Sequence, residues 1–411
     1  MTHTPHPSGS AAHLLPQGEK ETAAPSPLKI MLVAAEASGD ALGAGLAAAL
    51  KAQRPDASFV GVGGPRMAEQ GIVSPFDIAD LSILGWIEGI KAYGTVKRRV
   101  ADTVALAVQE RPDAVVLIDS WGFTIRVAKA IRAALPGVPL IKYVGPQVWA
   151  SRPGRAKTLA ASVDHLLALY AFDAPWFEAE GLATTVVGSQ ALHIDMSRAD
   201  PAQFRAACKI APDAPLLLVL PGSRPSEVRL MTPVYEAAVA QLKAANPALE
   251  VCVVVAGTVA EDVTARVAAW PFRVHLVEEA DKYAAMRAAT VALATSGTVS
   301  TELALAGAPM VIAYRFQPLS YALMKPFFTG KYATLLNHAA DAEIARELIQ
   351  TDATPDKIAA EVARLLSDPA ACADQTARQT AALDLMGREG RDPSQIAAEA
   401  VLRVIGTHTR S

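Results

Sequence analysis

Short apolar runs alternate with longer helix-like stretches, and this alternation constrains the fold more than any other feature of the sequence. From Lys29 onward, runs rich in Val, Ile and Leu are bounded by turn residues and separated by segments with helical periodicity. Continuous apolar runs of this kind are typical of parallel strands that are buried on both faces of a sheet. The expected strands of a first set are residues 29–35, 58–62, 113–118, 139–144, 164–170 and 184–187.

The alternation starts again after a polar stretch near Asp200. The expected strands of this second set are residues 215–220, 249–256, 272–277, 290–294 and 309–314. Helical patterns continue from residue 355 to residue 405. A chain of 411 residues exceeds the usual size of one hydrophobic core. We therefore expect an α/β protein with two doubly wound halves, whose last helices cross back to the first half.

Four parts of the chain follow from this division. Residues 1–27 are rich in Pro, Ser, His and Ala and lack a continuous apolar core, so we expect a disordered tail rather than a signal peptide. The first domain is expected at 28–195 and the second at 196–366. Residues 367–411 should form helices that pack back on the first domain.

The bulk composition excludes several classes of protein. The 38 Lys and Arg nearly balance the 41 Asp and Glu, so there is no overall basic surface for nucleic acid. The three cysteines are far apart and have no metal-type spacing, which fits a reducing cytoplasm and predicts neither a metal nor another cofactor. The most apolar region, 288–314, is interrupted by Glu302, two glycines and Pro309, so no transmembrane helix is expected.

The turn after the first expected strand is a candidate ligand site. It reads Glu36-Ala37-Ser38-Gly39-Asp40 and leads into a helix rich in Ala and Gly. Ligands of open parallel sheets bind beyond the carboxyl ends of strands, where backbone N–H groups of the next helix are exposed. An ordinary capped helix, packed tightly on the sheet, explains the same residues.

A second candidate turn follows the first strand of the second half. Gly222 and Ser223 let the backbone turn toward a ligand, and Arg224 supplies a planar cation suited to a diphosphate. Glu227 could orient Arg224 or cap the helix. A helix cap with a surface charge is the alternative reading of this turn.

A third candidate turn follows the fourth expected strand of the second half. Ser296, Gly297 and Thr298 open a helix, and Glu302 lies one turn further on. This spacing suits a phosphate at the helix start and a carboxylate that accepts hydrogen bonds from ribose hydroxyls. A capping box at Thr298 is the alternative.

Asp119 is the candidate catalytic residue. It follows a continuous apolar strand at 114–118, and a carboxylate in that position can serve as a general base. The same residue could instead cap the helix that follows. The histidines, including His193, show no spacing suited to a metal site.

A strongly apolar segment at residues 81–90 precedes a basic cluster at 97–99. Such a segment could receive acyl chains or lie on an anionic membrane surface, although a core helix with a solvated basic end is the simpler reading. The side chains that would make this contact are Ile83, Leu84, Trp86, Ile87 and Ile90.

Taken in order, these motifs resemble lipid-A-disaccharide synthases, a family of inverting glycosyltransferases with the GT-B fold of two facing Rossmann-like domains. The resemblance runs from residue 28 to the last helices. The matching stretches are residues 36–45 (EASGDALGAG), 59–67 (FVGVGGPRM), 118–119 (ID), 146–150 (PQVWA), 220–224 (LPGSR) and 296–298 (SGT) with Glu302.

The resemblance implies a reaction and its partners. A 2,3-diacylglucosamine would pass from its UDP derivative to 2,3-diacylglucosamine 1-phosphate, giving a β-1,6-linked disaccharide and UDP. The first domain would then bind the acceptor and the second the donor. The chain would be cytoplasmic, associated peripherally with the inner face of the cytoplasmic membrane, and a homodimer is left open.

The resemblance also implies residue roles. Asp119 would take the proton from the acceptor 6-hydroxyl. The UDP side would comprise Gly222, Ser223, Arg224, Ser296, Gly297, Thr298, Glu302 and Asn337, and the facing lobe would contribute Glu36, Ser38, Gly39 and Asp40. Direct attack at the anomeric carbon needs the base and the stabiliser of the leaving group on opposite sides, which two lobes can supply.

Three positions depart from the family pattern, namely Trp121-Gly122, Ser189 and Leu336.

Other classes of protein also fit part of the sequence. A cell-wall N-acetylglucosaminyl transferase or a UDP-sugar 2-epimerase would share the architecture, and a two-lobed solute-binding protein would share the shape without the chemistry.

Overall fold

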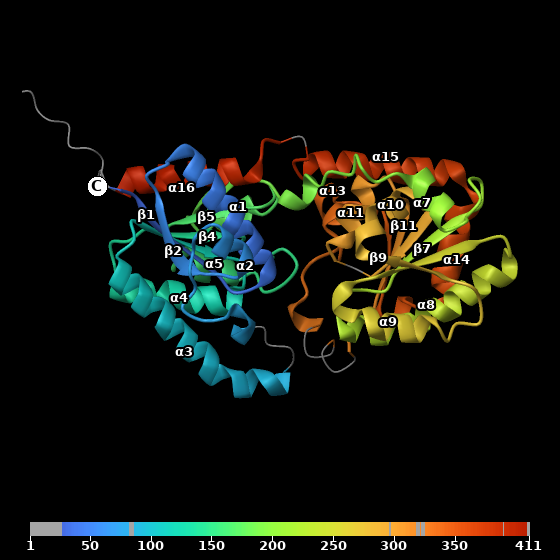
Figure 1. Cartoon of the computed structure of the whole chain (residues 1–411), viewed down its shortest axis with the longest axis horizontal. Coiled ribbons are helices and arrows are strands. Elements are labelled where there is room, and N and C mark those ends of the chain that lie inside the picture. Colours follow the sequence, from blue (N-terminus) through green and yellow to red (C-terminus); the bar gives the residue numbers. More distant parts are fainter. Residues whose placement is uncertain are drawn as a thin grey trace, which may run out of the picture.

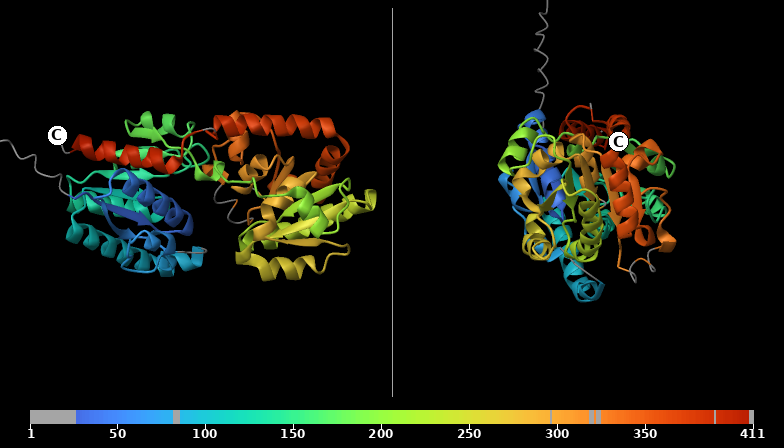
Figure 2. Two further views of the ribbon diagram at one scale, coloured as in Figure 1. Left: turned by 45° about the horizontal axis from the view of Figure 1, so that its top comes forward. Right: turned by 90° about the vertical axis from the view of Figure 1, so that its right-hand side faces the viewer.

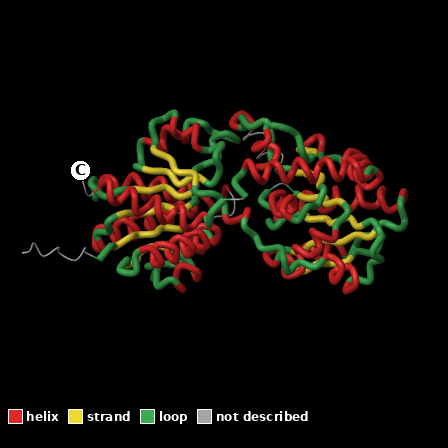
Figure 3. The backbone as a smooth tube through the Cα atoms, turned by 90° about the horizontal axis from the view of Figure 1, so that it is seen from above, coloured by secondary structure: helices red, strands yellow, loops and turns green. Residues whose placement is uncertain are grey.

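Two α/β lobes lie side by side in the structure (Figure 1). The computed structural model describes residues 27–81, 86–295, 297–317, 321, 325–388 and 390–408, and for residues 86–92 and 326 it describes the backbone alone. Each lobe is built on one parallel sheet with helices on both faces, which Figure 3 shows from above. The expected α/β architecture with two doubly wound halves is therefore confirmed.

The first lobe contains a six-stranded sheet in the order β2-β1-β3-β4-β5-β6. Its strands are β1 Lys29–Ala34, β2 Ser58–Val62, β3 Ala114–Ile118, β4 Leu140–Tyr143, β5 His165–Ala168 and β6 Ala183–Val186. Its helices are α1 Ala37–Gln53, α2 Pro65–Glu69, η1 Ile78–Leu81, α3 Trp86–Glu110, α4 Trp121–Ala134, α5 Arg155–Ala160, α6 Ala174–Glu178 and η2 Gln190–Leu192. All strand pairs are parallel.

The second lobe contains a six-stranded parallel sheet in the order β12-β11-β10-β7-β8-β9. Its strands are β7 Leu216–Leu220, β8 Glu250–Val255, β9 His275–Glu278, β10 Val291–Ala294, β11 Met310–Tyr314 and β12 Arg346–Ile349. Its helices are α7 Pro201–Ala207, α8 Pro225–Ala245, η3 Gly257–Val259, α9 Ala260–Val267, η4 Glu279–Asp281, α10 Lys282–Ala288, α11 Val299–Leu305, η5 Lys325–Phe327, α13 Leu335–Ala340, η6 Gln350–Asp352, α14 Pro355–Ser367 and α15 Pro369–Leu385.

Each sheet separates two hydrophobic cores. In the first lobe, alternate residues of β1 face opposite sides: Leu32 packs with Leu46 of α1, whereas Val33 packs with Val127 of α4. In the second lobe, Leu218 and Leu217 of β7 divide in the same way between the two cores. Because both faces are covered, the strands need apolar residues at every position, which explains the continuous runs in the sequence.

Helix α16 Pro393–His408 crosses back to the first lobe. It packs against α1 and buries Ala397 and Val401 in the core of the first lobe. Helix α15 stays on the second lobe, where Gln375 of α15 bonds to the main chain of Met310. The two helices lie over different lobes in Figure 2. The range expected to pack back, 367–411, is thus divided between the lobes.

Candidate active site

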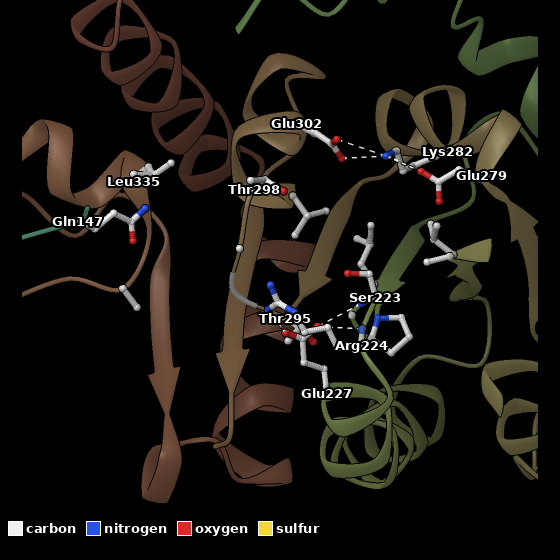
Figure 4. A pocket seen from close by; sticks show the side chains of 18 of the residues that line it. Gln147, Ser223, Arg224, Glu227, Glu279, Lys282, Thr295, Thr298, Glu302 and Leu335 are labelled. Atoms are coloured by element: carbon white, nitrogen blue, oxygen red, sulfur yellow. Dashed lines mark hydrogen bonds and ion pairs between the residues drawn. The ribbon is translucent and has the colours of Figure 1, made fainter. Parts of the chain in front are cut away.

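A cavity of about 470 Å³ lies between the lobes, at the carboxyl ends of β7 and β10 (Figure 4). Its volume is in the range of small-molecule sites. Gln147 and Trp149, which follow β4, line it from the first lobe. Most of the remaining lining comes from the turns after β7, β8, β9 and β10 and from the segment before α13. The cavity therefore lies where the sequence predicted a ligand, at strand ends of the second lobe.

The turn after β7 is fixed by a buried carboxylate. Glu227 Oε2 accepts hydrogen bonds from the backbone N–H groups of Ser223 (3.2 Å) and Arg224 (3.3 Å). Its other oxygen accepts from Arg224 Nη1 at 2.9 Å. Gly222 has a φ of 110°, and a Cβ atom there would lie 2.6 Å from Glu227 Oε2, so no other residue fits. The side chain of Arg224 remains 71% exposed, and its guanidinium group is available to an anion in the cavity.

The turn after β10 forms another wall of the cavity. Gly297, Thr298 and Glu302 line it, and Thr298 is the N-cap residue of α11. Ser296 lies outside the described residues. Glu302 forms an ion pair with Lys282 Nζ at 3.1 Å, and the same ammonium group forms a second ion pair with Glu279 at 2.8 Å. Figure 4 shows this chain of three charges at the edge of the cavity.

Lys282 and Glu279 were not predicted from the sequence. Burial opposes the charge of Lys282, but the two neighbouring carboxylates together raise its pKa, so it is a permanent cation beside the cavity. Glu302 is consequently held in place by an ion pair rather than by a helix-capping contact. The charge-rich stretch at 278–282 was the available signal, but it reads equally as a solvated surface.

Asp119 lies at the carboxyl end of β3 in an unusual backbone conformation. Asp119 and Ser120 have φ angles of 48° and 39°, a left-handed pair that costs free energy in residues other than glycine. Ser38 Oγ, at the start of α1, donates a hydrogen bond to Asp119 Oδ2 at 3.2 Å. Two predicted residues from separate turns thus meet at the edge of the first sheet. Glu36, the N-cap residue of α1, is exposed nearby.

A buried lysine supports the turn that carries Asp119. Lys142, in β4, is 2% exposed and donates hydrogen bonds to the carbonyl oxygen of Asp119 and, at 2.9 Å, to Thr124 Oγ1. Burial lowers the pKa of Lys142 to about 7, although the charges of Asp119 and Glu36 act in the opposite direction. Sequence reasoning missed this residue. A single lysine within an apolar strand was the signal that could have found it.

Two other residues of the predicted site in the first lobe, Gly39 and Asp40, have roles in the fold. Gly39 is buried, and a Cβ atom there would lie 3.3 Å from Ala34 Cβ, so glycine allows α1 to approach the sheet closely. Asp40 is 3% exposed, and its carboxylate accepts hydrogen bonds from the N–H groups of residues 64, 66 and 67 at 2.7–3.0 Å. The carboxylate of Asp40 therefore holds the start of α2, and its contact with a ligand stays a prediction.

The side chain of Asn337 also forms hydrogen bonds that hold the fold together. It is fully buried, and its Nδ2 donates to the carbonyl of Ala345 and to Glu347 Oε1, both at 2.8 Å. Its Oδ1 accepts from the N–H groups of Ile344 and Ala345. Both polar atoms of the Asn337 side chain thus have partners within the protein, and its contact with a donor stays a prediction. Asn337 positions α13, whose first residue, Leu335, lines the cavity.

The apolar segment at 81–90 is described only in part. Ile83 and Leu84 lie outside the described residues, and for Trp86, Ile87 and Ile90 only the backbone, in α3, is described. Within the described ranges, no helix has the length and apolar character needed to cross a bilayer. No group of three metal-binding side chains occurs in that part of the chain either.

The lobes are joined at a seam beside the cavity. Ser151 and Phe328 form an antiparallel bridge, and the N–H of Thr329 donates to the carbonyl of Ala150 at 3.0 Å. The residues at 150–151 belong to the first lobe and those at 328–329 to the second. Main-chain hydrogen bonds therefore fix how the two walls of the cavity face each other.

Two facing parallel sheets with a cavity between their lobes define a protein of the GT-B-like class. Solved structures of this class match nearly the whole chain. The S. aureus MnaA–UDP complex matches with a TM-score of 0.61 at 14% identity, covering 93% of this chain and 97% of that chain. A UDP-GlcNAc 2-epimerase from Neisseria meningitidis bound to UDP-GlcNAc matches with a TM-score of 0.55 at 12% identity, covering 92% and 100%. These likenesses concern the fold alone.

Sequence comparison then gives the family. The family model described as lipid-A-disaccharide synthetase matches residues 30–401. The lipid-A-disaccharide synthase of Rhodospirillum centenum is 46% identical over 381 residues, which is 92% of this chain and 95% of the relative. That of Paramagnetospirillum magneticum is 42% identical over 380 residues, 92% and 97%. The chain belongs to the lipid-A-disaccharide synthase family and is a glycosyltransferase, which confirms the resemblance of the motifs.

Proposed function

We propose that the chain transfers 2,3-diacylglucosamine from UDP to the 6-hydroxyl of 2,3-diacylglucosamine 1-phosphate, with inversion, giving a β-1,6-linked disaccharide 1-phosphate and UDP. One observation carries the proposal beyond family membership. A carboxylate, Asp119, and an exposed guanidinium group, Arg224, lie at carboxyl edges of the two different sheets. Inverting transfer needs a base on one side of the anomeric carbon and a stabiliser of the leaving group on the other.

On the acceptor side, Asp119 takes the proton of the 6-hydroxyl as its oxygen attacks the anomeric carbon. Ser38 donates to Asp119 Oδ2 and so restricts the carboxylate to one orientation. Oδ1, which has no hydrogen bond to another described residue, is the oxygen that receives the proton. Lys142 and Thr124 hold the main chain beneath. The base is therefore pre-oriented before the acceptor arrives.

On the donor side, the bond between the anomeric carbon and the diphosphate oxygen breaks, and UDP leaves with the electron pair. Arg224 neutralises the developing charge on the diphosphate, and Ser223 and Thr298 add hydroxyl donors beside it. Glu302 accepts from the ribose hydroxyls while Lys282 keeps its carboxylate in place. The role of Ser296 is proposed from its position in the same turn.

Peripheral association with the inner face of the cytoplasmic membrane is part of the proposal, because both substrates carry acyl chains. Helix α3 supports it: Tyr93 is 61% exposed, and Lys97 and Arg98 are exposed further along the helix. An exposed aromatic ring with nearby cations suits an anionic lipid surface. Sedimentation with anionic and neutral vesicles tests this point. A Lys97→Gln/Arg98→Gln variant should bind anionic vesicles more weakly, and unchanged binding would argue against α3 as the contact.

The reaction is tested by incubating the protein with UDP-2,3-diacylglucosamine and 2,3-diacylglucosamine 1-phosphate, followed by mass spectrometry. The proposal expects UDP and one disaccharide 1-phosphate in equal amounts. UDP release that does not require the acceptor would contradict glycosyl transfer. An epimerised UDP-sugar without disaccharide would favour the 2-epimerase alternative.

A further inference from the structure

The segment at 144–151 follows β4 and carries the first lobe's part of the cavity wall. Its first residue, Val144, has a φ of 70°, an uncommon conformation for a β-branched side chain. The N–H of Val144 donates to the carbonyl of Leu167 in β5 at 3.0 Å, which holds this strained residue on the sheet. Strain of this kind persists only where the surrounding structure fixes it, and it is common at ligand sites.

The same segment is held by both lobes. Val148 is fully buried in the core of the first lobe, and its N–H donates to the carbonyl of Pro146 at 2.8 Å. The carbonyl of Gln147 accepts from the N–H of Ser151 at 3.1 Å, and Ser151 forms the bridge to Phe328 of the second lobe. The main chain of Gln147 is therefore fixed where the lobes meet.

The side chain of Gln147 offers a free amide to the cavity. Gln147 is exposed, and Figure 4 shows it on the opposite side of the cavity from Lys282 and Glu279. Within the described part of the chain, no hydrogen bond to this amide occurs. Trp149, which lines the same wall, already donates its indole N–H to Asp173. Gln147 thus supplies the polar group of this wall that a ligand can bind.

The chemistry of the cavity wall differs between the lobes. Arg224 and Lys282 of the second lobe are cations, whereas Gln147 of the first lobe is neutral. A carboxamide has an acceptor oxygen and two N–H donors, so it suits hydroxyl groups, which also donate and accept. In UDP-2,3-diacylglucosamine the charge lies on the diphosphate, and the sugar keeps free hydroxyls at positions 4 and 6. A donor with its diphosphate at Arg224 extends its sugar along the same cavity toward the first lobe.

We propose that Gln147 binds the 4- and 6-hydroxyls of the transferred sugar, so that the first lobe selects the sugar and the second lobe selects the nucleotide. This assignment rests on the proposed function, which supplies the donor and places its diphosphate at Arg224. The amide oxygen accepts from one hydroxyl, and the amide N–H groups donate to the other. The contact fixes the sugar, and with it the anomeric carbon, relative to the lobe that carries Asp119.

The test removes the amide from the protein and the hydroxyls from the donor. Gln147→Met keeps the length of the side chain and should raise KM for UDP-2,3-diacylglucosamine by about 5- to 30-fold, the loss of one or two neutral hydrogen bonds. KM for the acceptor and the UDP affinity measured by calorimetry should equal those of the wild type. A 4,6-dideoxy donor should show nearly the same KM with the wild type and with Gln147→Met, because both lack the contact.

Gln203→Met is the matched control, because Gln203 is exposed on α7 and lies outside the cavity. It should behave as the wild type with both donors. An unchanged KM for the natural donor in Gln147→Met, an equal loss with the two donors, or a raised KM for the acceptor instead would overturn the role of Gln147 while leaving the proposed function intact. Absence of disaccharide from the wild-type protein would overturn both.

Discussion

The indole ring of Trp149 stacks on the imidazole ring of His338, with ring centroids 3.8 Å apart and planes at 16°. Trp149 belongs to the first lobe and His338 to α13 of the second. Phe172 packs edge-on against both rings, and Asp173 accepts a hydrogen bond from Trp149 Nε1 at 3.0 Å. Because Trp149 also lines the cavity, this contact couples the angle between the lobes to the shape of the cavity.

Loss of this contact should loosen the two lobes. His338→Ala should lower the free energy of unfolding by about 0.5–1.5 kcal/mol, the range for an aromatic pair, and increase the radius of gyration without ligand. Denaturant titration and small-angle X-ray scattering measure the two effects. His193→Ala, at an exposed histidine, is the control. Identical scattering curves for wild type and His338→Ala would show that the stack does not hold the lobes.

Replacement of the proposed base should affect chemistry rather than binding. Asp119→Asn should lower kcat by about 10²- to 10⁴-fold, because general base catalysis contributes an effect of this size. The UDP affinity measured by calorimetry should remain unchanged, since the proposed UDP site lies in the other lobe. Asp113→Asn changes an exposed carboxylate before the opposite end of the same strand and should retain activity. Near-normal turnover of Asp119→Asn would remove Asp119 from the mechanism.

Arg224 should contribute to UDP affinity. Arg224→Ala removes the exposed guanidinium group of the cavity and should weaken UDP binding by about 10- to 100-fold, the usual effect of a charged hydrogen bond. Calorimetric titration with UDP measures the change. Arg229→Ala, further along α8 at an exposed site outside the cavity, should bind UDP as the wild type does. Equal affinities for the two variants would exclude Arg224 from the donor site.

Lys142 should make stability depend on pH above neutrality. Its pKa is lowered by burial from 10.5 to about 7, so between these values the unfolded chain binds more protons than the folded one. The effect of Lys142 on the free energy of unfolding follows from this difference. Stability is highest above the unfolded pKa, where the amine is neutral in both states, and it is lost as the pH falls through the folded pKa. The free energy of unfolding of the wild type, relative to Lys142→Met, should therefore increase from about pH 7 to about pH 10.

Urea titrations across that pH range test this prediction for Lys142. The exposed Lys129, on α4, supplies the control, and Lys129→Met should follow the wild type at every pH. Parallel pH curves for wild type and Lys142→Met would mean that the pKa of Lys142 is the same in the folded and the unfolded chain.

Strand positions were predictable because they depend on local composition. Eleven expected runs each overlap an observed strand, whereas β12 was missed. This edge strand contains Arg346 and Glu347, and of its four residues only Leu348 is buried, so the apolar signal is absent. The division at residue 195 stays a prediction.

The positions of candidate site residues were predictable where these residues follow the carboxyl ends of strands. Asp119 and Arg224 lie in turns directly after strands, and Glu302 lies in the first turn of the helix that follows β10, where the rule for parallel sheets places ligand contacts. The buried hydrogen bonds of Asp40 and Asn337 could not be predicted, because their partners lie in other turns and are set by tertiary structure. A sequence motif places a residue near a site without showing which way its side chain points.

The return of α16 has a consequence for how the protein is made. Ala397, Val401 and their neighbours complete the core of the first lobe, yet they are encoded after the whole of the second. Domains commonly fold in order as they leave the ribosome. Here the first lobe, although translated first, can complete its core only after α16 has been synthesised. Until then, the face of α1 that α16 covers is left open. The second lobe can reach its native state earlier.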